Sequence, residues 1–113
     1  MISAAILSSI SEHFKRCAPK EGCGVLALKR GELKWIPCTN IAQEDEDFIL
    51  DTNEYLKIYY THEIVGIVHN HVHSSCKPSE TDIKYCNITR IPYYIFSYPS
   101  MESCILEPRE SYL

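Results

Sequence analysis

The chain of 113 residues lacks any long apolar run and any excess of basic charge. Its longest stretches free of Asp, Glu, Lys, Arg and His, residues 1–11 and 91–101, fall well short of the roughly 20 apolar residues that a membrane-spanning helix needs. Eleven Lys and Arg residues face fifteen Asp and Glu residues, which gives a net charge of −4. This balance argues against a nucleic-acid-binding domain with a broad basic footprint and against binding to an anionic membrane. We therefore expect neither a nucleic-acid partner nor a membrane partner.

The sequence also lacks a CxxC pair and a secretory signal. Without CxxC, neither a zinc ribbon nor a thioredoxin-type redox motif is expected. The first residues contain four serines by Ser11 and no basic segment, unlike a signal peptide. We therefore expect a cytoplasmic protein whose cysteines stay reduced, form no structural disulfide and pack as small apolar groups. The six cysteines are Cys17, Cys23, Cys38, Cys76, Cys86 and Cys104.

No repeat, low-complexity tract or linker interrupts the sequence, so we expect one domain over residues 1–113. Apolar spacing of three and four residues, together with capping residues, predicts three helices. Short apolar runs bounded by turn residues predict the strands. Helices that alternate with strands and hairpins indicate an α/β fold, or α+β sandwich, with a mixed sheet flanked by helices. The expected helices cover residues 2–17, 52–60 and 78–88, and the expected strands cover residues 23–28, 33–38, 63–68, 93–98 and 103–106.

Polar residues of metal-ligating type follow one of these strands. The apolar run at residues 63–68 leads directly into His69, and ligands of open α/β sheets bind beyond the carboxyl ends of strands. Residues two apart in an extended chain point to the same side, so His69 and His71 can face one point. After a loop, the next helix has Ser79 and Asp82 in its first turn. Two imidazoles and a carboxylate form a suitable ligand set for a catalytic zinc, whose fourth position is left to water.

Each part of this pattern also has an ordinary structural interpretation. Ser79 followed three residues later by Asp82 is typical of a helix N-cap with an acid in the first turn. A single histidine beside a strand is more often a structural residue than a ligand. The combination favours a metal site, because one strand directs both histidines and the cap follows one loop later.

One residue separates His69 from His71, seven residues then lead to Ser79, and two more lead to Asp82. This spacing resembles the JAMM signature of the MPN/JAB zinc metallopeptidases. This family also has an early glutamate, often in the setting Pro-x-Glu-x-Cys-Gly, which residues 19–24 match. The resemblance implies a fold similar to that of the cytidine deaminases, with a central sheet between helices.

The resemblance also implies a role for each matching residue. His69, His71 and Asp82 would bind Zn²⁺, Glu21 would be the general acid/base, and Ser79 would help to hold the oxyanion. The implied reaction is hydrolysis of a peptide or isopeptide bond. Many members have proline after the second histidine, where this chain has Val72 and His73. We therefore expect a looser loop here, with His73 as an additional polar group but not as a metal ligand.

Two other enzyme classes fit the sequence less well. The contiguous His69-Asn70-His71 suggests an HNH nuclease, but those three residues are dispersed in that family and its ββα-metal context is absent here. A zinc deaminase would need His-x-Glu and Pro-Cys-x-x-Cys, which this chain lacks. The stronger alternative is a catalytically silent MPN-type scaffold that takes part in a larger assembly.

The size of the chain resembles the compact bacterial and phage members, including the N-terminal domain of lambda-type tail assembly proteins. The implied partners are a protein or peptide substrate, a phage tail component or a ubiquitin-like protein, in the host cytoplasm if the protein is phage-encoded. We expect an extended tail beside a sheet edge as substrate. Residues 93–98 are the nearest aromatic stretch, although at least half of these rings should pack in the core. The acidic run at residues 44–47 is expected in a solvated loop and would disfavour acidic substrates if it lay near the cleft.

Overall fold

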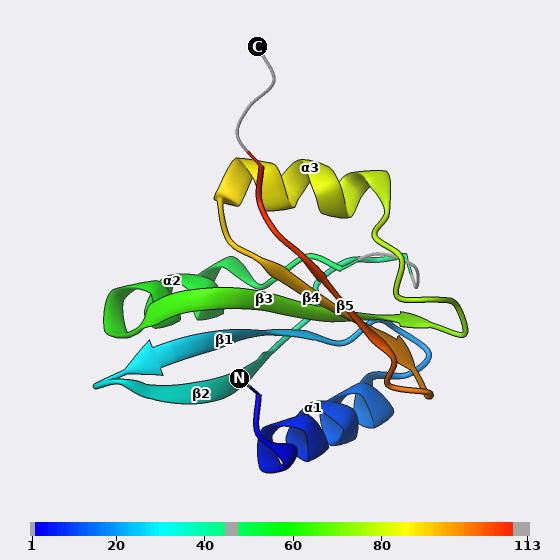
Figure 1. Cartoon of the computed structure of the whole chain (residues 1–113), viewed down its shortest axis with the longest axis horizontal. Helices are drawn as coiled ribbons and strands as arrows, with labels where there is room; N and C mark the ends of the chain where they lie inside the picture. Colours follow the sequence, from blue (N-terminus) through cyan, green and yellow to red (C-terminus); the bar gives the residue numbers. More distant parts are fainter. Residues whose placement is uncertain (1, 45–47, 110–113) are drawn as a thin grey trace.

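Five strands form one mixed sheet in the computed structural model, which describes residues 2–44 and 48–109. The strand order is β2-β1-β3-β4-β5, with β3 and β4 parallel and the other neighbours antiparallel. The expected mixed sheet flanked by helices is confirmed (Figure 1). The helices are α1 (Ala4–Cys17), α2 (Thr52–Thr61) and α3 (Glu80–Thr89), and the strands are β1 (Cys23–Lys29), β2 (Glu32–Cys38), β3 (Glu63–Val72), β4 (Tyr93–Tyr98) and β5 (Ser103–Leu106).

The sheet is the middle layer of three. In Figure 1, α1 lies on one face of the sheet, and α2 and α3 lie on the other. Ile10 and Phe14 of α1 are fully buried and pack with Leu26, Val68 and Phe96 of the sheet. A second cluster on the opposite face joins the sheet to the other two helices. It contains Cys23, Val25, Ala27, Ile67, Tyr93 and Ile95 from the sheet, Ile58 from α2, Cys86 from α3, and Cys38 and Cys76.

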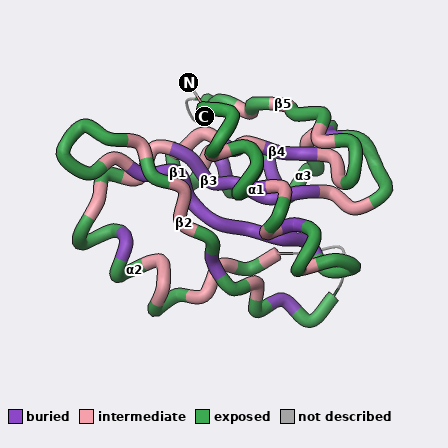
Figure 2. Tube along the Cα trace, turned by 90° about the horizontal axis from the view of Figure 1, so that it is seen from below, coloured by how far each residue is buried: buried purple, intermediate pink, exposed green. Residues whose placement is uncertain are grey.

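The central strands β1 and β3 are covered on both faces, as their near-continuous apolar sequences predict. The first five residues of β1 are all buried, and so are the five residues of β3 from Gly66 to Asn70. Figure 2 shows these buried segments running side by side through the middle of the molecule. A polar side chain on either strand therefore lies in a largely dry environment and needs a partner there.

Strand β3 is longer than the sequence predicts. The apolar run ends at Val68, but β3 continues to Val72 because β4 pairs with it in parallel from Ile67 to Val72. The β1 partner ends earlier, with Cys23 opposite His69. His69 and His71 consequently lie within the strand rather than just after it.

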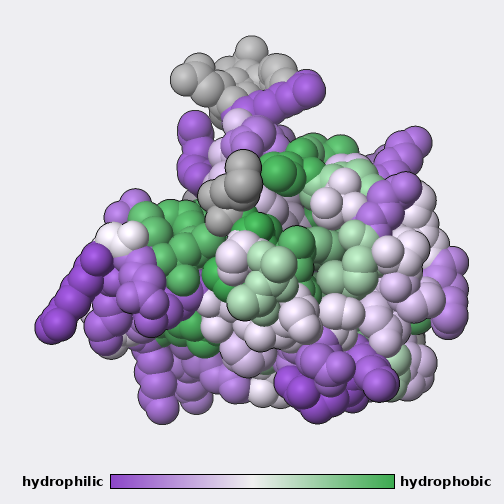
Figure 3. Space-filling view, turned by 60° about the horizontal axis from the view of Figure 1, so that its bottom comes forward, coloured by the Kyte–Doolittle hydropathy of each residue, from purple (hydrophilic) through white to green (hydrophobic). Residues whose placement is uncertain are grey.

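The outer surface of the molecule is mixed. On the face shown in Figure 3, apolar side chains gather near the centre and hydrophilic side chains surround them. Of the acidic run, Glu44 is exposed, whereas Asp45, Glu46 and Asp47 lie outside the described residues. Across residues 2–44 and 48–109, no helix is both long enough and apolar enough to cross a bilayer.

The packing of α1 on the sheet generates a stability prediction. Phe14 is 0% exposed and its ring lies 5.8 Å from that of Phe96. Phe14→Ala should lower the free energy of unfolding by about 3–5 kcal/mol, because it leaves a cavity that the sheet cannot fill. Leu7→Ala in the same helix, where the side chain is 38% exposed, is the matched control and should cost about 1 kcal/mol or less. Urea denaturation followed by circular dichroism measures both values, and equal losses would contradict the assignment of this core.

Candidate metal centre

Strand β3 directs two imidazoles to one face of the sheet. His69 lies between Cys23 of β1 and Ile95 of β4, and its side chain is only 1% exposed. His71, two residues further, has a side chain that is 14% exposed. Their ring centroids are 5.2 Å apart. The two-residue alternation of a strand thus places both histidines on the same side, as the sequence predicts.

Asp82 reaches the same point from the first turn of α3. The Ser79 hydroxyl oxygen accepts a hydrogen bond from the Asp82 backbone N–H at 3.0 Å, and Asp82 Oδ2 accepts one from the Ser79 N–H at 3.0 Å. This capping box starts the helix and holds the carboxylate in place. The Asp82 residue is 5% exposed. The cap interpretation is therefore confirmed, and the cap leaves the Asp82 carboxylate beside the two histidines.

The three groups converge. Nε2 of His69 lies 3.1 Å from Asp82 Oδ1, and Nε2 of His71 lies 3.3 Å from Asp82 Oδ2. One ligand atom from each of the three residues can be chosen so that all lie within 4.8 Å of one another. Tetrahedral zinc with bonds of about 2.0–2.2 Å separates neighbouring ligand atoms by roughly 3.3–3.6 Å. The donor types and their spacing therefore fit a zinc ion.

Burial and pairing set the charge of this cluster. Burial raises the pKa of the Asp82 carboxyl, but hydrogen bonds from His69 and His71 outweigh it and hold the pKa far below its usual range. The hydrogen bond to Asp82 raises the pKa of His71, whereas burial lowers the pKa of His69. Asp82 is therefore ionised, and His69 favours the neutral form that a metal ligand requires.

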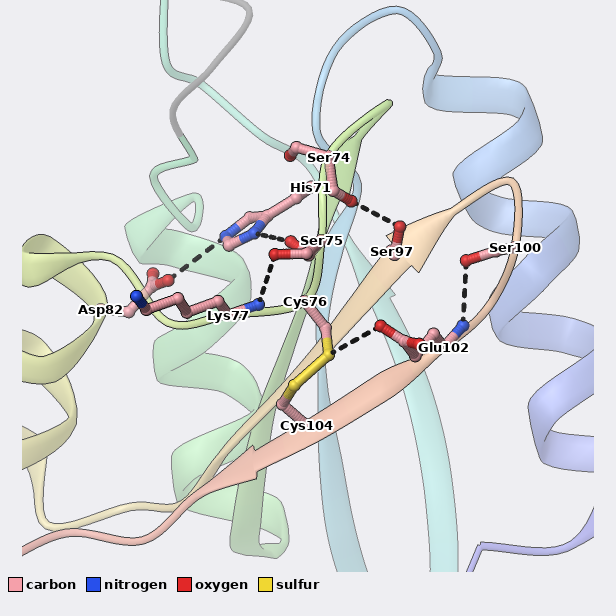
Figure 4. Close-up of a disulfide and its surroundings, with 10 residues drawn as sticks. All are labelled: His71, Ser74, Ser75, Cys76, Lys77, Asp82, Ser97, Ser100, Glu102 and Cys104. Carbon is pink, nitrogen blue, oxygen red and sulfur yellow. Dashed lines mark hydrogen bonds and ion pairs between the residues drawn. A yellow bond between two sulfur atoms is a disulfide. The ribbon is translucent and has the colours of Figure 1, made fainter.

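The loop after β3 fixes the orientation of His71. Nδ1 of His71 donates to the carbonyl oxygen of Ser75 at 2.8 Å, because a carbonyl can only accept. In this orientation neutral His71 carries its lone pair on Nε2, so Nε2 donates to Asp82 only when the ring is protonated and can bind a metal only when it is not. The Ser97 hydroxyl donates to the carbonyl of Ser74 (Figure 4). The His73 N–H donates to the carbonyl of Tyr98 at 3.0 Å. The expectation of a loose loop is wrong, since β4 holds it at two points.

The expectation of six free thiols is also wrong. Cys76 in this loop forms a disulfide with Cys104 of β5, with Cα atoms 5.6 Å apart (Figure 4). Cys104 pairs with Ile95 in the sheet, and the loop after β3 passes over that position. The two cysteines are 28 residues apart in the sequence, and only the fold brings them together. The remaining cysteines behave as expected: Cys23, Cys38 and Cys86 are buried, Cys17 is partly buried, and burial raises the pKa of Cys38 to about 12.

Glu21 lies just before β1 and close to the three-residue cluster, but not within it. It is 6% exposed, and its negative charge contributes to the raised pKa of His71. The group of residues that can share a metal contains His69, His71 and Asp82 and not Glu21. Glu21 is thus within electrostatic range of His71 and lies outside the group of three.

Ser79, His73 and the tyrosine-rich strand complete the set of residues that the sequence singled out. Ser79 is exposed at the edge of the site, and His73 is an exposed residue outside the three-residue group. Strand β4 lies inside the sheet, between β3 and β5. Its aromatic side chains pack in the two cores: Tyr93 faces His69 edge-on, and Tyr94, Phe96 and Tyr98 pack on the α1 side.

Sequence reasoning missed Phe48. Its ring stacks on that of His69, with centroids 4.2 Å apart and planes 22° apart. Phe48 lies between the acidic run and α2, far from β3 in the sequence, so no local pattern connects it to the site. It covers one side of His69 and limits the access of water to this ligand.

Comparison with known proteins identifies the family. A profile described as prokaryotic homologues of the JAB domain matches residues 3–105. This chain belongs to that family. It is therefore a compact member of the JAMM/MPN group, which the HxH and SxxD segments predict.

Three curated relatives match most of the chain. Tail tip assembly protein K of Escherichia phage N15 is 33% identical over 104 residues, which is 91% of this chain and 43% of that protein. The chain thus spans less than half of the phage relative. The CysO-cysteine peptidase of Mycobacterium tuberculosis is 31% identical over 86% of this chain and 72% of its own length. The "Probable TtuB-protein conjugate cleaving protease" of Thermus thermophilus is 29% identical over 93% of this chain and 74% of its own length.

Solved structures agree on the fold. A protein of Desulfitobacterium hafniense superimposes with a TM-score of 0.74 at 21% identity, over 91% of this chain and 78% of that one. A JAB1/MPN domain protein of Archaeoglobus fulgidus gives a TM-score of 0.56 at 23% identity, over 92% and 94%. At these identities the likeness concerns the fold alone.

The disulfide gives a prediction that corrects the thiol count. Titration of the denatured, unreduced protein with a thiol reagent should find four free thiols, and prior reduction should raise this number to six, because only Cys76 and Cys104 are paired. Cys104→Ser should give five thiols without reduction. Six thiols in the unreduced wild type would contradict the bond.

Proposed function

We propose that this protein is a zinc-dependent peptidase or isopeptidase. The observation that carries the proposal is the convergence of two imidazole nitrogens and a buried, ionised carboxylate, with the buried Glu21 in electrostatic range of His71. Two relatives whose names describe peptidase or conjugate-cleaving activity support an enzyme rather than a scaffold.

In this proposal His69, His71 and Asp82 hold the zinc ion. When bound there, zinc would supply a Lewis acid that lowers the pKa of water and polarises a carbonyl. The protein contributes three ligands whose orientation is fixed before the ion arrives. Ser75 holds the ring of His71, Phe48 covers that of His69, and the capping box holds Asp82.

Glu21 acts as the general base and then as the general acid. Its carboxylate accepts a proton from the attacking water, whose oxygen forms a bond to the carbonyl carbon of the substrate. Glu21 then delivers this proton to the leaving nitrogen as the carbon–nitrogen bond breaks, so the products are a carboxylate and an amine. Burial of Glu21 and its electrostatic influence on His71 support this role.

Ser79 stabilises the negative charge that develops on the carbonyl oxygen of the substrate. Its oxygen accepts the hydrogen bond from the Asp82 N–H, so its own hydroxyl hydrogen remains for a substrate. Because Ser79 is exposed beside the half-buried His71, this donor lies where a substrate can reach it. A donor of this kind contributes about 3 kcal/mol to transition-state stabilisation.

The substrate proposed for this site is an extended tail or flexible segment of a protein. The relatives named for CysO-cysteine and for TtuB–protein conjugates favour removal of a small protein modifier. The tail tip assembly relative favours a role in building a phage tail. Both alternatives require hydrolysis of a bond in a chain segment that can extend into the site. Efficient cleavage of a compact protein without a tail, and of no extended peptide, would exclude this substrate class.

Metal content tests the ligand set. The purified wild type should bind one Zn²⁺ per chain, and His71→Ala or Asp82→Ala should weaken zinc binding by at least about 100-fold, since even outer-shell changes cost ~10–100-fold. His73→Ala is the matched control, because His73 lies two residues along the chain but outside the cluster, and it should keep stoichiometric zinc. Zinc is measured by competition with a chromogenic chelator. Full zinc content in both ligand variants would exclude the assignment.

Hydrolysis tests the role of Glu21. The zinc-loaded wild type should cleave members of a library of extended peptides, and Glu21→Gln should lower kcat by about 10²–10⁴-fold, because Gln keeps the size of the side chain and loses its basicity. Zinc content and the unfolding midpoint should stay unchanged. Glu12→Gln, an exposed position on α1, should retain full activity. A zinc-loaded wild type that cleaves no peptide and no protein conjugate would favour the scaffold function.

A further inference from the structure

Both polar atoms of the peptide bond between Glu21 and Gly22 are held by asparagine side chains. Nδ2 of Asn40 donates to the Glu21 carbonyl oxygen at 2.8 Å, and the Gly22 N–H donates to Oδ1 of Asn70 at 2.6 Å. The Asn70 backbone N–H also donates to the Gly22 carbonyl at 3.3 Å. The backbone that carries Glu21 is therefore fixed from two separate segments of the chain.

Asn70 occupies a special place in the strand. It is 0% exposed and lies between His69 and His71, so its side chain points to the opposite face of the sheet. Its Nδ2 has no hydrogen-bond partner among the described residues. An apolar side chain of similar size would avoid burying this unpaired donor, but it would leave the buried Gly22 N–H without its acceptor, so an asparagine is required to hold this backbone.

The contact between Asn70 and Gly22 depends on the glycine. A Cβ atom at Gly22 would lie 2.7 Å from a ring carbon of Phe14 and 3.4 Å from Oδ1 of Asn70. Only a residue without a side chain lets the backbone approach the sheet this closely. The segment before β1 is thus packed between α1 and β3 with its orientation determined.

Asn40 is itself held in one orientation. Its Oδ1 accepts hydrogen bonds from the backbone N–H groups of Ala42 at 2.9 Å and of Ile49 at 3.0 Å. Because the oxygen is engaged by two donors, the Nδ2 group must face the carbonyl of Glu21. Asn40 therefore connects the loop after β2 to the same peptide bond that Asn70 holds.

We infer that Asn40 and Asn70 are positioning residues for Glu21, an inference that rests on the catalytic role proposed for that residue. Fixing the Glu21–Gly22 peptide plane sets the direction in which the Glu21 side chain leaves the backbone. Strand β3 then presents two metal ligands on one face of the sheet. On the opposite face, its Asn70 side chain holds the backbone of the general base. The distance between the two histidines and the Glu21 backbone therefore depends largely on strand β3.

Variants of Asn70 test this inference. Asn70→Leu keeps the size of the side chain and removes the acceptor, whereas Asn70→Asp keeps an acceptor oxygen in the same place. Asn70→Leu should lower kcat at least tenfold with KM and zinc content nearly unchanged, and it should lower the unfolding midpoint because it leaves the buried Gly22 N–H unpaired. Asn70→Asp should recover most of the lost rate. Asn53→Leu, at an exposed position of α2, is the control and should leave kcat unchanged.

A second readout does not depend on turnover. Three-bond NMR couplings of the Glu21 Cβ protons should report a single χ1 rotamer in the wild type and averaging over several rotamers in Asn70→Leu. Asn40→Leu, which removes the donor to the Glu21 carbonyl, should show the same averaging. In a Glu21→Gln background, the residual rate should not fall further on adding Asn70→Leu, because both changes act through one side chain.

The outcomes separate this inference from the proposed function. If the zinc-loaded wild type shows no turnover, the proposed function fails, and the rotamer measurement alone decides whether the asparagines position Glu21. A folded Asn70→Leu variant with wild-type kcat and a single Glu21 rotamer would overturn the inference. If Asn70→Leu fails to fold, the rotamer of Glu21 in Asn40→Leu decides it, and a single rotamer there counts against the inference.

Discussion

The site depends on the alternation of side chains along one buried strand. Because β3 lies between β1 and β4, it cannot shift its register by one residue without turning His69 and His71 to the α1 face of the sheet, away from Asp82. The same alternation sends Asn70 to the other face, where it binds the backbone of Gly22. The pairing of three strands therefore fixes the two histidines and the backbone next to Glu21 together.

The second constraint is electrostatic. A carboxylate as buried as that of Asp82 is costly to fold unless it is paired and hydrogen-bonded. Both imidazoles and the Ser79 N–H meet this requirement, and the N-terminus of α3 adds a favourable dipole. Asp82, which completes the capping box at the start of α3, therefore also completes the cluster. Because Asp82 takes part in both the cap and the cluster, the start of α3 must lie at a fixed position relative to β3.

The sequence predicted the elements and the cluster because both rest on short-range patterns. Apolar periodicity located all three helices and all five strands, with β4 and β5 correct to the residue. The spacing from His69 to Asp82 spans a single strand, loop and helix start, so its geometry is nearly local. What the sequence could not show depends on contacts between distant segments. The stacking of Phe48 on His69, the bond between Cys76 and Cys104 and the contact of Asn40 with Glu21 all belong to this class.

The disulfide matters because of the loop in which it occurs. Where many family members have proline after the second histidine, this chain has Val72 followed by His73, whose backbone adopts a positive φ of 58°. A histidine tolerates that conformation only where its surroundings impose it. Hydrogen bonds to β4 and the bond from Cys76 to β5 impose it here, and the neighbouring Ser75 carbonyl is consequently held against Nδ1 of His71. The sheet edge β5, remote from the ligands in sequence, thus helps to determine which nitrogen of His71 faces Asp82.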